Sequence, residues 1–145
     1  MNKFFLNLGT QPLANNFLTK YNSKQIKYNL KLYFNTKTKL VSISKRIPSK
    51  QMFNNKYPYK SSMSMTMRKS FKSLASKIIK RFNPNLLLEI GSNDGTLIQN
   101  FKKNNVIGVE PCKNLAKITK KKGFKTYDEY WDLKLANKLL IKHGE

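Results

Sequence analysis

The first half of the chain contains two short apolar runs and one long amphipathic segment. Residues 29–34 and 40–44 are β-prone runs separated by polar residues, and this pattern predicts a β-hairpin. Residues 1–24 show neither a helical nor a strand period. Farther along, apolar side chains recur at the spacing of one helix face until Pro84, which predicts a helix that ends there. The apolar positions of this helix are Phe71, Leu74, Ala75, Ile78, Ile79 and Phe82.

From residue 85 the pattern changes to alternating strands and helices. Strands are predicted at 86–90, 106–109 and 124–127, and helices at 96–103, 114–122 and 132–142. The continuous apolar run of the first strand is typical of a strand buried on both faces. Such alternation predicts right-handed crossovers and a parallel sheet. The last helix is expected to bury a face made of Leu133, Ala136, Leu139 and Leu140.

The charge is strongly positive and unevenly distributed. Lys and Arg number 29 against 7 acidic residues, a net charge of +22. Residues 1–88 hold 18 of the basic residues and no acid, whereas residues 89–145 hold 11 basic residues and all 7 acids. The positive electrostatic field of such a chain attracts nucleic acid or anionic lipid. The alternative is drift in base composition, because Lys and Asn are abundant whereas Arg, which base readout favours, occurs three times.

Several classes of protein are excluded or disfavoured by composition. A single cysteine, Cys112, excludes a disulfide framework and a multi-cysteine zinc cluster within this chain. The broken apolar run at residues 1–9 is too short for a signal peptide, and no run approaches the ~18 to 20 apolar residues that span a bilayer. We therefore expect a cytoplasmic protein with no membrane partner.

The segment 89–96 carries the candidate chemistry, because it joins a predicted strand to a predicted helix. Gly91 allows the chain to turn sharply, and Gly95 allows the start of the following helix to approach closely. A dinucleotide-binding fingerprint would read G-x-G-x-x-G, and here Asn93 replaces its middle glycine. Asp94 would repel a pyrophosphate, so a ligand with a positive centre fits better. Glu110 ends the second strand about 20 residues past Gly91, where an acid accepts hydrogen bonds from ribose hydroxyls. The pattern favours S-adenosylmethionine; the alternative is an ordinary turn beside a surface glutamate.

Four stretches in this order resemble a known family: 8–15, 57–64, 89–95 and 108–111. They are similar to the class I methyltransferases that include the nucleotide-sugar C-methyltransferases. The resemblance implies a zinc-binding N-terminal domain, a central S-adenosylmethionine domain and a C-terminal domain. It also implies that the Tyr-x-Tyr-x-Ser-Ser segment lies near the cofactor and the sugar. The expected cofactor-binding residues are Glu89, Gly91, Ser92, Asn93, Asp94, Gly95, Glu110, Tyr57 and Tyr59, and the expected substrate-binding residues are Ser61 and Ser62.

The chain also departs from this family. The family carries two Cys-x-x-Cys pairs; the first would lie upstream of residue 1, and the second would fall where this chain has Asn35 and Thr38. An amide and a hydroxyl do not replace thiolates around zinc, so no zinc is expected. The family's general base comes from a region beyond the fourth strand, and the single histidine, His143, is expected to be a helix-terminal residue. No catalytic residue is therefore predicted in this chain.

These observations together predict an α/β protein with part of a Rossmann-like methyltransferase domain. We expect parallel strands in the order 3-2-1 at 85–145, a connecting amphipathic helix at 63–84, and a zinc-less, hairpin-containing α+β segment at 1–62. The family sheet has the order 3-2-1-4-5-7-6, so the strand at 86–90 would be an edge strand with a missing neighbour. The expected function is that of a truncated sugar C-methyltransferase, inactive alone or completed by a second polypeptide. The alternative is a basic module that binds nucleic acid on an α/β scaffold.

Overall fold

The computed structural model describes residues 1–21 and 24–144. The chain forms two compact units, residues 1–52 and the part from residue 53 onward. Each unit is described by itself. None of the helices in the described ranges combines the length and the apolar character needed to cross a membrane.

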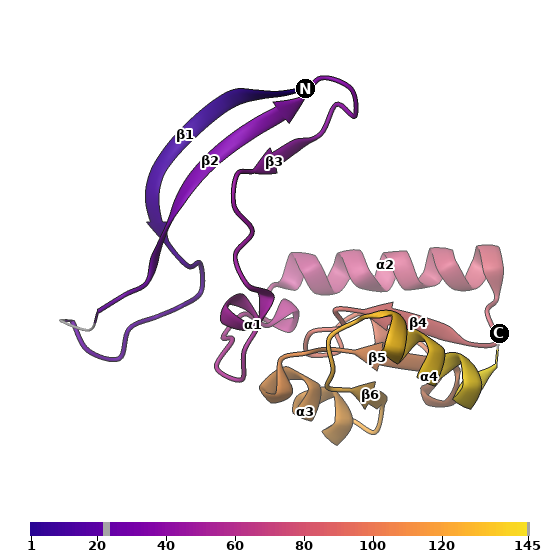
Figure 1. Cartoon of the computed structure of the whole chain (residues 1–145). Coiled ribbons are helices and arrows are strands. Elements are labelled where there is room, and N and C mark those ends of the chain that lie inside the picture. The colour runs from indigo at the N-terminus through magenta and orange to yellow at the C-terminus, as the bar shows by residue number, and fades with distance from the viewer. Residues whose placement is uncertain (22–23, 145) are drawn as a thin grey trace. The chain divides into compact units, whose positions relative to one another are not determined.

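The first unit is a three-stranded antiparallel sheet followed by a short helix (Figure 1). The strands are β1 (Asn2–Pro12), β2 (Lys27–Asn35) and β3 (Val41–Ile43), in the order β1-β2-β3, and α1 spans Ser49–Met52. The predicted hairpin is confirmed by the pairing of β2 with β3. Its turn is closed by the Asn35 side chain, whose Oδ1 accepts from the amides of Lys37 and Thr38 at 3.0 and 2.9 Å.

β1 is a strand that the apolar pattern did not reveal. Its pairing with β2 shifts register twice, between Phe4 and Leu6 and between Asn7 and Thr10. Gly9 lies in the second irregularity with a φ of +71°. A bulge moves the following side chains to the opposite face, so the period of two is lost. Every residue of β1 is exposed, so burial imposes no alternation either.

The second unit begins with the predicted helix. The helix α2 spans Met65–Phe82, and the Ser64 side chain caps it by accepting from the Met67 amide at 3.2 Å. It ends at Asn83, which takes the left-handed conformation with a φ of +41°. A short 3-10 turn, η1 (Ser61–Met63), precedes it. The helix prediction is confirmed.

Three parallel strands form the centre of this unit, which confirms the α/β class and the parallel sheet. They are β4 (Leu87–Ile90), β5 (Val106–Val109) and β6 (Lys125–Tyr127), in the order β4-β5-β6. The helix α3 (Lys113–Lys121) connects β5 to β6, and α4 (Leu133–His143) follows β6. Both helices agree with the predicted ones, and Asp132 caps α4 by accepting from the Leu135 amide at 2.8 Å.

The two faces of the parallel sheet are covered by different segments. On one face Leu87 and Val106 pack against Ile98 and Phe124. On the other face Val109 packs against the α4 side chains Leu135 and Leu139. The helix α4, which follows β6, therefore lies on one face of the sheet. The segment that contains Ile98, which joins β4 to β5, lies on the other face.

Three details of the prediction are wrong. The segment 96–103 forms the 3-10 turns η2 (Ile98–Asn100) and η3 (Lys103–Asn105), because the Asn100 side chain takes the carbonyls of Thr96 and Leu97 that a helix would use. On α4, Leu133 and Leu140 are exposed, whereas Leu135 and Leu139 are buried. β4 is not buried on both faces: Leu88 is 39% and Ile90 is 52% exposed.

Candidate functional site

The turn after β4 is held against the end of β5. The amides of Gly91 and Ser92 both donate to the Val109 carbonyl, at 2.8 and 3.1 Å. Gly91 has a φ of +76°, and nothing lies within 4 Å of where a Cβ would be. Gly95 has a φ of +78°, but a Cβ there would come within 2.8 Å of Thr119 Cγ2. The first glycine therefore leaves the turn open, and the second lets the turn pack against α3.

Glu110 follows β5 and points toward this turn. Its Oε2 accepts from the Asn93 amide at 2.8 Å, and its Oε1 accepts from the Cys112 amide at 2.8 Å. The side chain is 5% exposed. Burial, together with a hydrogen bond to Glu110 and its negative charge, raises the pKa of the Cys112 thiol to about 12. A carboxylate offers about four lone-pair positions, so these backbone bonds orient Glu110 without using all of its acceptor capacity.

Asn93 ties the segment 57–62 to the same edge of the sheet. Its Oδ1 accepts from the Ser61 amide at 2.9 Å, and its Nδ2 donates to the Tyr59 carbonyl at 3.2 Å. The Asn114 side chain at the start of α3 donates to the Tyr57 carbonyl at 2.8 Å. Two stretches that lie 32 residues apart are thus joined, and the structure brings together the two groups of predicted site residues. Ser61 is buried, Tyr57 is half-buried, and Tyr59 is exposed.

Asp94 lies inside the turn rather than at its surface. The side chain is buried, and its Oδ1 accepts from the Thr96 hydroxyl at 2.6 Å. Its Oδ2 accepts from the Ser62 amide at 3.4 Å. The Asp94 carbonyl accepts from Lys122 Nζ at 3.0 Å. This carboxylate therefore fixes the shape of the turn and connects it to the segment 57–62.

Glu89 is the least satisfied carboxyl group of the edge. It occupies β4 opposite Gly108 of β5. Burial raises the pKa of the Glu89 carboxyl group to about 7. A hydrogen bond with the backbone of Ile98 lowers this pKa, and the negative charge of Glu110 raises it further. Its Oε2 is buried without a hydrogen-bond partner in the described part of the chain, as are Ser92 Oγ and Asn114 Oδ1. Glu89 therefore keeps its proton to a higher pH than an exposed glutamate does.

The local charge of this edge is the reverse of the charge of the whole chain. Glu89, Asp94 and Glu110 come together in a protein of net charge +22. Such an environment disfavours a phosphate and favours a ligand with a cationic centre and hydroxyl or amino donors. Within residues 1–21 and 24–144, no group of three or more His, Cys, Asp or Glu side chains is arranged to share a metal ion.

Sequence reasoning missed Cys112, Asn114 and Tyr130. Cys112 and Asn114 lie between β5 and the first turn of α3, so their position after a strand-ending acid was the available signal. Burial and the nearby Cys112 and Glu110 raise the pKa of Tyr130. Its hydroxyl donates to the Phe53 carbonyl at 2.5 Å, a contact across 77 residues that no local pattern reveals.

The chain matches no model of a known protein family, and no curated protein matches it. The function is therefore inferred from the residues of the site.

Proposed function

We propose that the carboxyl edge of the β4-β5-β6 sheet binds S-adenosylmethionine, and that this chain is the cofactor-binding part of a methyltransferase of the sugar C-methyltransferase type. In this proposal the parallel sheet is one half of a Rossmann-like domain. Ligands of open α/β sheets bind outside the carboxyl ends of the strands, which is where the turn, Glu110 and the segment 57–62 meet.

The orientation of Glu110 carries the proposal. Two backbone amides hold its carboxylate beside the Gly91 turn, and its remaining acceptor positions suit the two hydroxyls of a ribose. The open space at Gly91 suits close approach of a ligand to the backbone. Glu89 adds negative charge for a cationic tail, and the buried acceptors without donors fit a ligand that carries donors.

The segment 57–62 would then cover the cofactor and contact the sugar. Tyr59 supplies an exposed aromatic ring beside the turn, and Ser61 and Ser62 are tied to Asn93 and Asp94 by their backbone amides. When bound, S-adenosylmethionine supplies a methyl group to a carbanion next to a sugar ketone. No residue among those described is assigned to proton abstraction in this proposal.

Calorimetry with the full chain tests the cofactor. We expect S-adenosylhomocysteine to bind at least tenfold more tightly than ADP, because the acidic turn repels phosphates. Glu110→Gln should abolish the preference, since an amide nitrogen would face a backbone amide donor. Glu129→Gln, which changes an exposed carboxylate paired with Lys138, is the matched control and should bind like the original chain. Equal binding of ADP, or no binding of S-adenosylhomocysteine by a folded chain, would overturn the proposal.

The acid-free first 88 residues support a second candidate, a nucleic-acid-binding module. Their 18 basic side chains have no carboxylate side chain within the same stretch to neutralise them. This candidate predicts that the chain binds single- or double-stranded nucleic acid. The logarithm of its binding constant should fall steeply and linearly with the logarithm of the salt concentration. The methyltransferase proposal predicts weak binding that does not depend on the sequence of the nucleic acid. Fluorescence anisotropy with two unrelated oligonucleotides at 50 and 200 mM salt distinguishes the two.

A further inference from the structure

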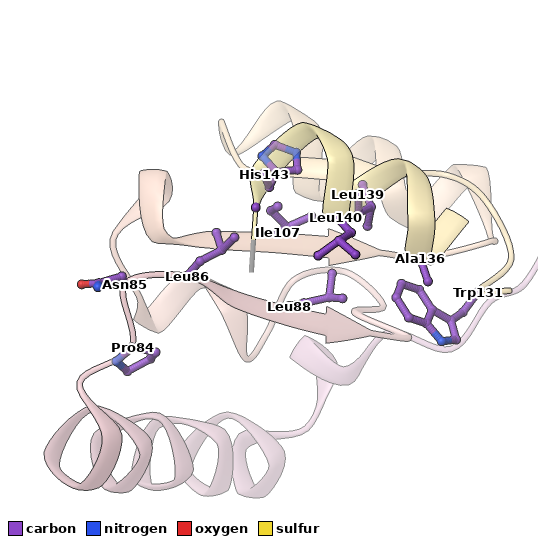
Figure 2. Close-up of a pocket in the computed structure, with 11 residues that line it drawn as sticks. Pro84, Asn85, Leu86, Leu88, Ile107, Trp131, Ala136, Leu139, Leu140 and His143 are labelled. Carbon is purple, nitrogen blue, oxygen red and sulfur yellow. The ribbon is translucent and has the colours of Figure 1, made fainter. Parts of the chain in front are cut away.

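The parallel sheet has a hollow at the amino ends of its strands. Its volume is about 360 Å³, and it is lined by residues at the starts of β4, β5 and β6 and at the end of α4. Leu86, Ile107 and His143 also line the adjoining groove that Figure 2 shows, where Leu86 lies at the tail of the β4 arrow and His143 lies beside Ile107. The polar side chains that line the hollow are Lys103, Asn104, Lys125 and His143.

No carboxylate in the described part of the chain neutralises the lysines of this hollow. The salt bridges of the described residues are made by Lys120 and Lys138, which do not line it. Glu145 lies outside the described residues. The amino edge of the sheet is therefore basic, whereas the carboxyl edge is acidic. The described acids all lie in the last part of β4 or after a strand: Glu89, Asp94, Glu110, Asp128, Glu129 and Asp132.

The position of Lys103 depends on a glycine and a buried ring. A Cβ at Gly123 would lie 2.9 Å from Lys103 Nζ, so the glycine leaves room for the ammonium group. The same ammonium lies 5.7 Å from the centre of the Phe124 ring, which is a cation–π contact. Phe124 is buried, so the ring is a fixed support. Neutral groups thus hold Lys103 at the hollow, and its charge remains available to a ligand.

His143 lies among positive charges at the same edge. It is half-buried at the end of α4, and its Nε2 lies 3.1 Å from the Tyr127 hydroxyl oxygen. Burial, Lys125 and Lys142 lower the pKa of its imidazole below the ordinary value of 6.5. An anion in the hollow would offset the repulsion among these groups and would raise that pKa.

We infer that this hollow binds the phosphate group of a small organic phosphate. Lysine and histidine side chains donate charge-assisted hydrogen bonds to phosphate, and lysine does so as a point charge rather than by the planar fork of arginine. Asn104 adds an amide donor. The volume lies in the range of small-molecule sites, and Leu86 and Ile107 supply an apolar wall for the carbon atoms of the ligand.

A small phosphate fits this hollow better than a nucleic acid does. Nucleic-acid binding uses contacts to many successive phosphates, whereas the cations here converge on one hollow. The site is also independent of the proposed methyl-donor site, because that site lies at the other end of the strands, where Glu110 meets the turn after β4. The two ends of the sheet therefore suit ligands of opposite charge.

Calorimetry with the full chain and ribose 5-phosphate tests the inference. Its phosphate carries a charge of about −1.5 to −2 at pH 7. We expect ribose, the control compound, to bind at least tenfold more weakly, because contacts to the phosphate supply the affinity. Ribose also controls for binding at Glu110, whose remaining acceptor positions suit ribose hydroxyls. Equal binding of the two compounds, or no binding of ribose 5-phosphate by the folded chain, would overturn the inference.

Neighbouring lysines provide matched variants. Lys103→Gln should weaken binding of ribose 5-phosphate at least fivefold, because it removes a charge-assisted hydrogen bond. Lys125→Gln should have the same effect while leaving the contact between Lys103 and Phe124 in place. Lys102→Gln is the control, because it removes the same charge one residue away from Lys103 and Lys102 does not line the hollow. It should change binding less than twofold. Equal losses in Lys102→Gln and Lys103→Gln would show an effect of net charge alone and would contradict the inference.

The single histidine of the chain reports where the phosphate binds. NMR follows the His143 imidazole as the pH is varied, with and without ribose 5-phosphate. We expect the pKa of His143 to rise on binding, because a bound phosphate stabilises the imidazolium. In Lys125→Gln the pKa should start higher, since one of the cations that lower it is gone, and the ligand should shift it less. An unchanged pKa of His143 at saturating ligand would place the phosphate elsewhere and would overturn the inference.

Competition with a short oligothymidine identifies the source of the phosphate. We expect the oligonucleotide to leave ribose 5-phosphate bound at physiological salt concentration, because the hollow accepts one phosphate group. Displacement of ribose 5-phosphate, together with a loss of oligonucleotide affinity in Lys103→Gln, would assign the hollow to nucleic acid. That result would overturn the assignment of a small ligand.

Discussion

Glu89 and Glu110 are two carboxylates of the same corner with different environments. Glu110 accepts from the amides of Asn93 and Cys112, whereas one oxygen of Glu89 is buried without a partner in the described part of the chain. Hydrogen bonds stabilise a charged carboxylate, and desolvation without them favours the neutral form. The hydrogen bonds of Glu110 indicate that it positions the turn, whereas burial raises the pKa of the Glu89 carboxyl group to about 7.

Glu89 makes the stability of the second unit depend on pH. Its pKa is about 7 in the folded chain against an ordinary value of 4.5, so the folded state holds the proton more tightly. The cost of burying the charge is absent below about pH 4.5, grows as the pH rises and is complete above about pH 7. We expect Glu89→Gln to be more stable than the original chain by about 3 kcal/mol at pH 8 and by much less at pH 5. Urea unfolding at the two pH values checks this, with Glu129→Gln as the exposed control. A stability difference that does not change with pH would contradict it.

The two glycines of the turn provide a matched pair of substitutions. Both have a positive φ, but a Cβ meets Thr119 Cγ2 at 2.8 Å only at Gly95. We expect Gly91→Ala to lower the free energy of unfolding by about 1 kcal/mol through backbone strain, and Gly95→Ala by about 1–3 kcal/mol more through overpacking. Adding Thr119→Ser, which removes Cγ2, should recover part of the second loss. Denaturant unfolding measures all three, and equal losses for the two glycines would disprove the close-packing role of Gly95.

At the scale of elements, the segment 57–62 is positioned by side chains of the turn and of α3. Asn93 makes two of the connections, to the Ser61 amide and the Tyr59 carbonyl, while its own φ is +51°. Because glycine tolerates this φ, Asn93→Gly removes the two hydrogen bonds without adding backbone strain. The substitution therefore separates the attachment of the segment from the conformation of the turn.

We expect Asn93→Gly to release the segment while the sheet stays formed. The Ser61 amide should exchange with deuterium about fivefold faster, since a lost hydrogen bond contributes about 1 kcal/mol. The Glu110 amide, which donates to the Tyr127 carbonyl at 2.9 Å, is the control and should exchange as before. Hydrogen exchange followed by NMR measures both amides. Unchanged exchange at Ser61 would show that Asn93 does not hold the segment.

Local patterns predict the elements that have a regular apolar pattern and clear end signals. α2 has an apolar period and a stop at Pro84, and β5 is a continuous buried run. The pattern does not reveal β1, because bulges break its alternation. It predicts a helix at 96–103, because the competing Asn100 side chain does not alter an apolar period. The motif predicts the candidate site residues, but the hydrogen bond that the Ser61 amide donates to Asn93 depends on tertiary packing across 32 residues. The sequence therefore identified which residues meet, and the structure supplies how they are joined.

At the scale of the whole molecule, the two units differ in what stabilises them. Among the described residues, Leu13 is the one buried apolar side chain of residues 1–52, whereas eleven lie beyond residue 52. The first unit also has 10 basic residues and no acid, so charge repulsion opposes its compact state. Burial of apolar surface is the main stabilising contribution to folding, so the first unit is expected to open more easily.

Limited proteolysis with trypsin tests this difference, because its cleavage sites are evenly distributed. Residues 1–52 hold 10 Lys and Arg residues, and the other 93 residues hold 19, so each unit offers about one site in five positions. We expect the first cuts of the native chain within the first unit, followed by a resistant fragment that contains 65–144, because cleavage requires local opening. Digestion in urea, where both units are open, should cut both in proportion to their sites. Native cleavage at equal rates in both units would show that the sparse burial of the first unit does not make it less stable.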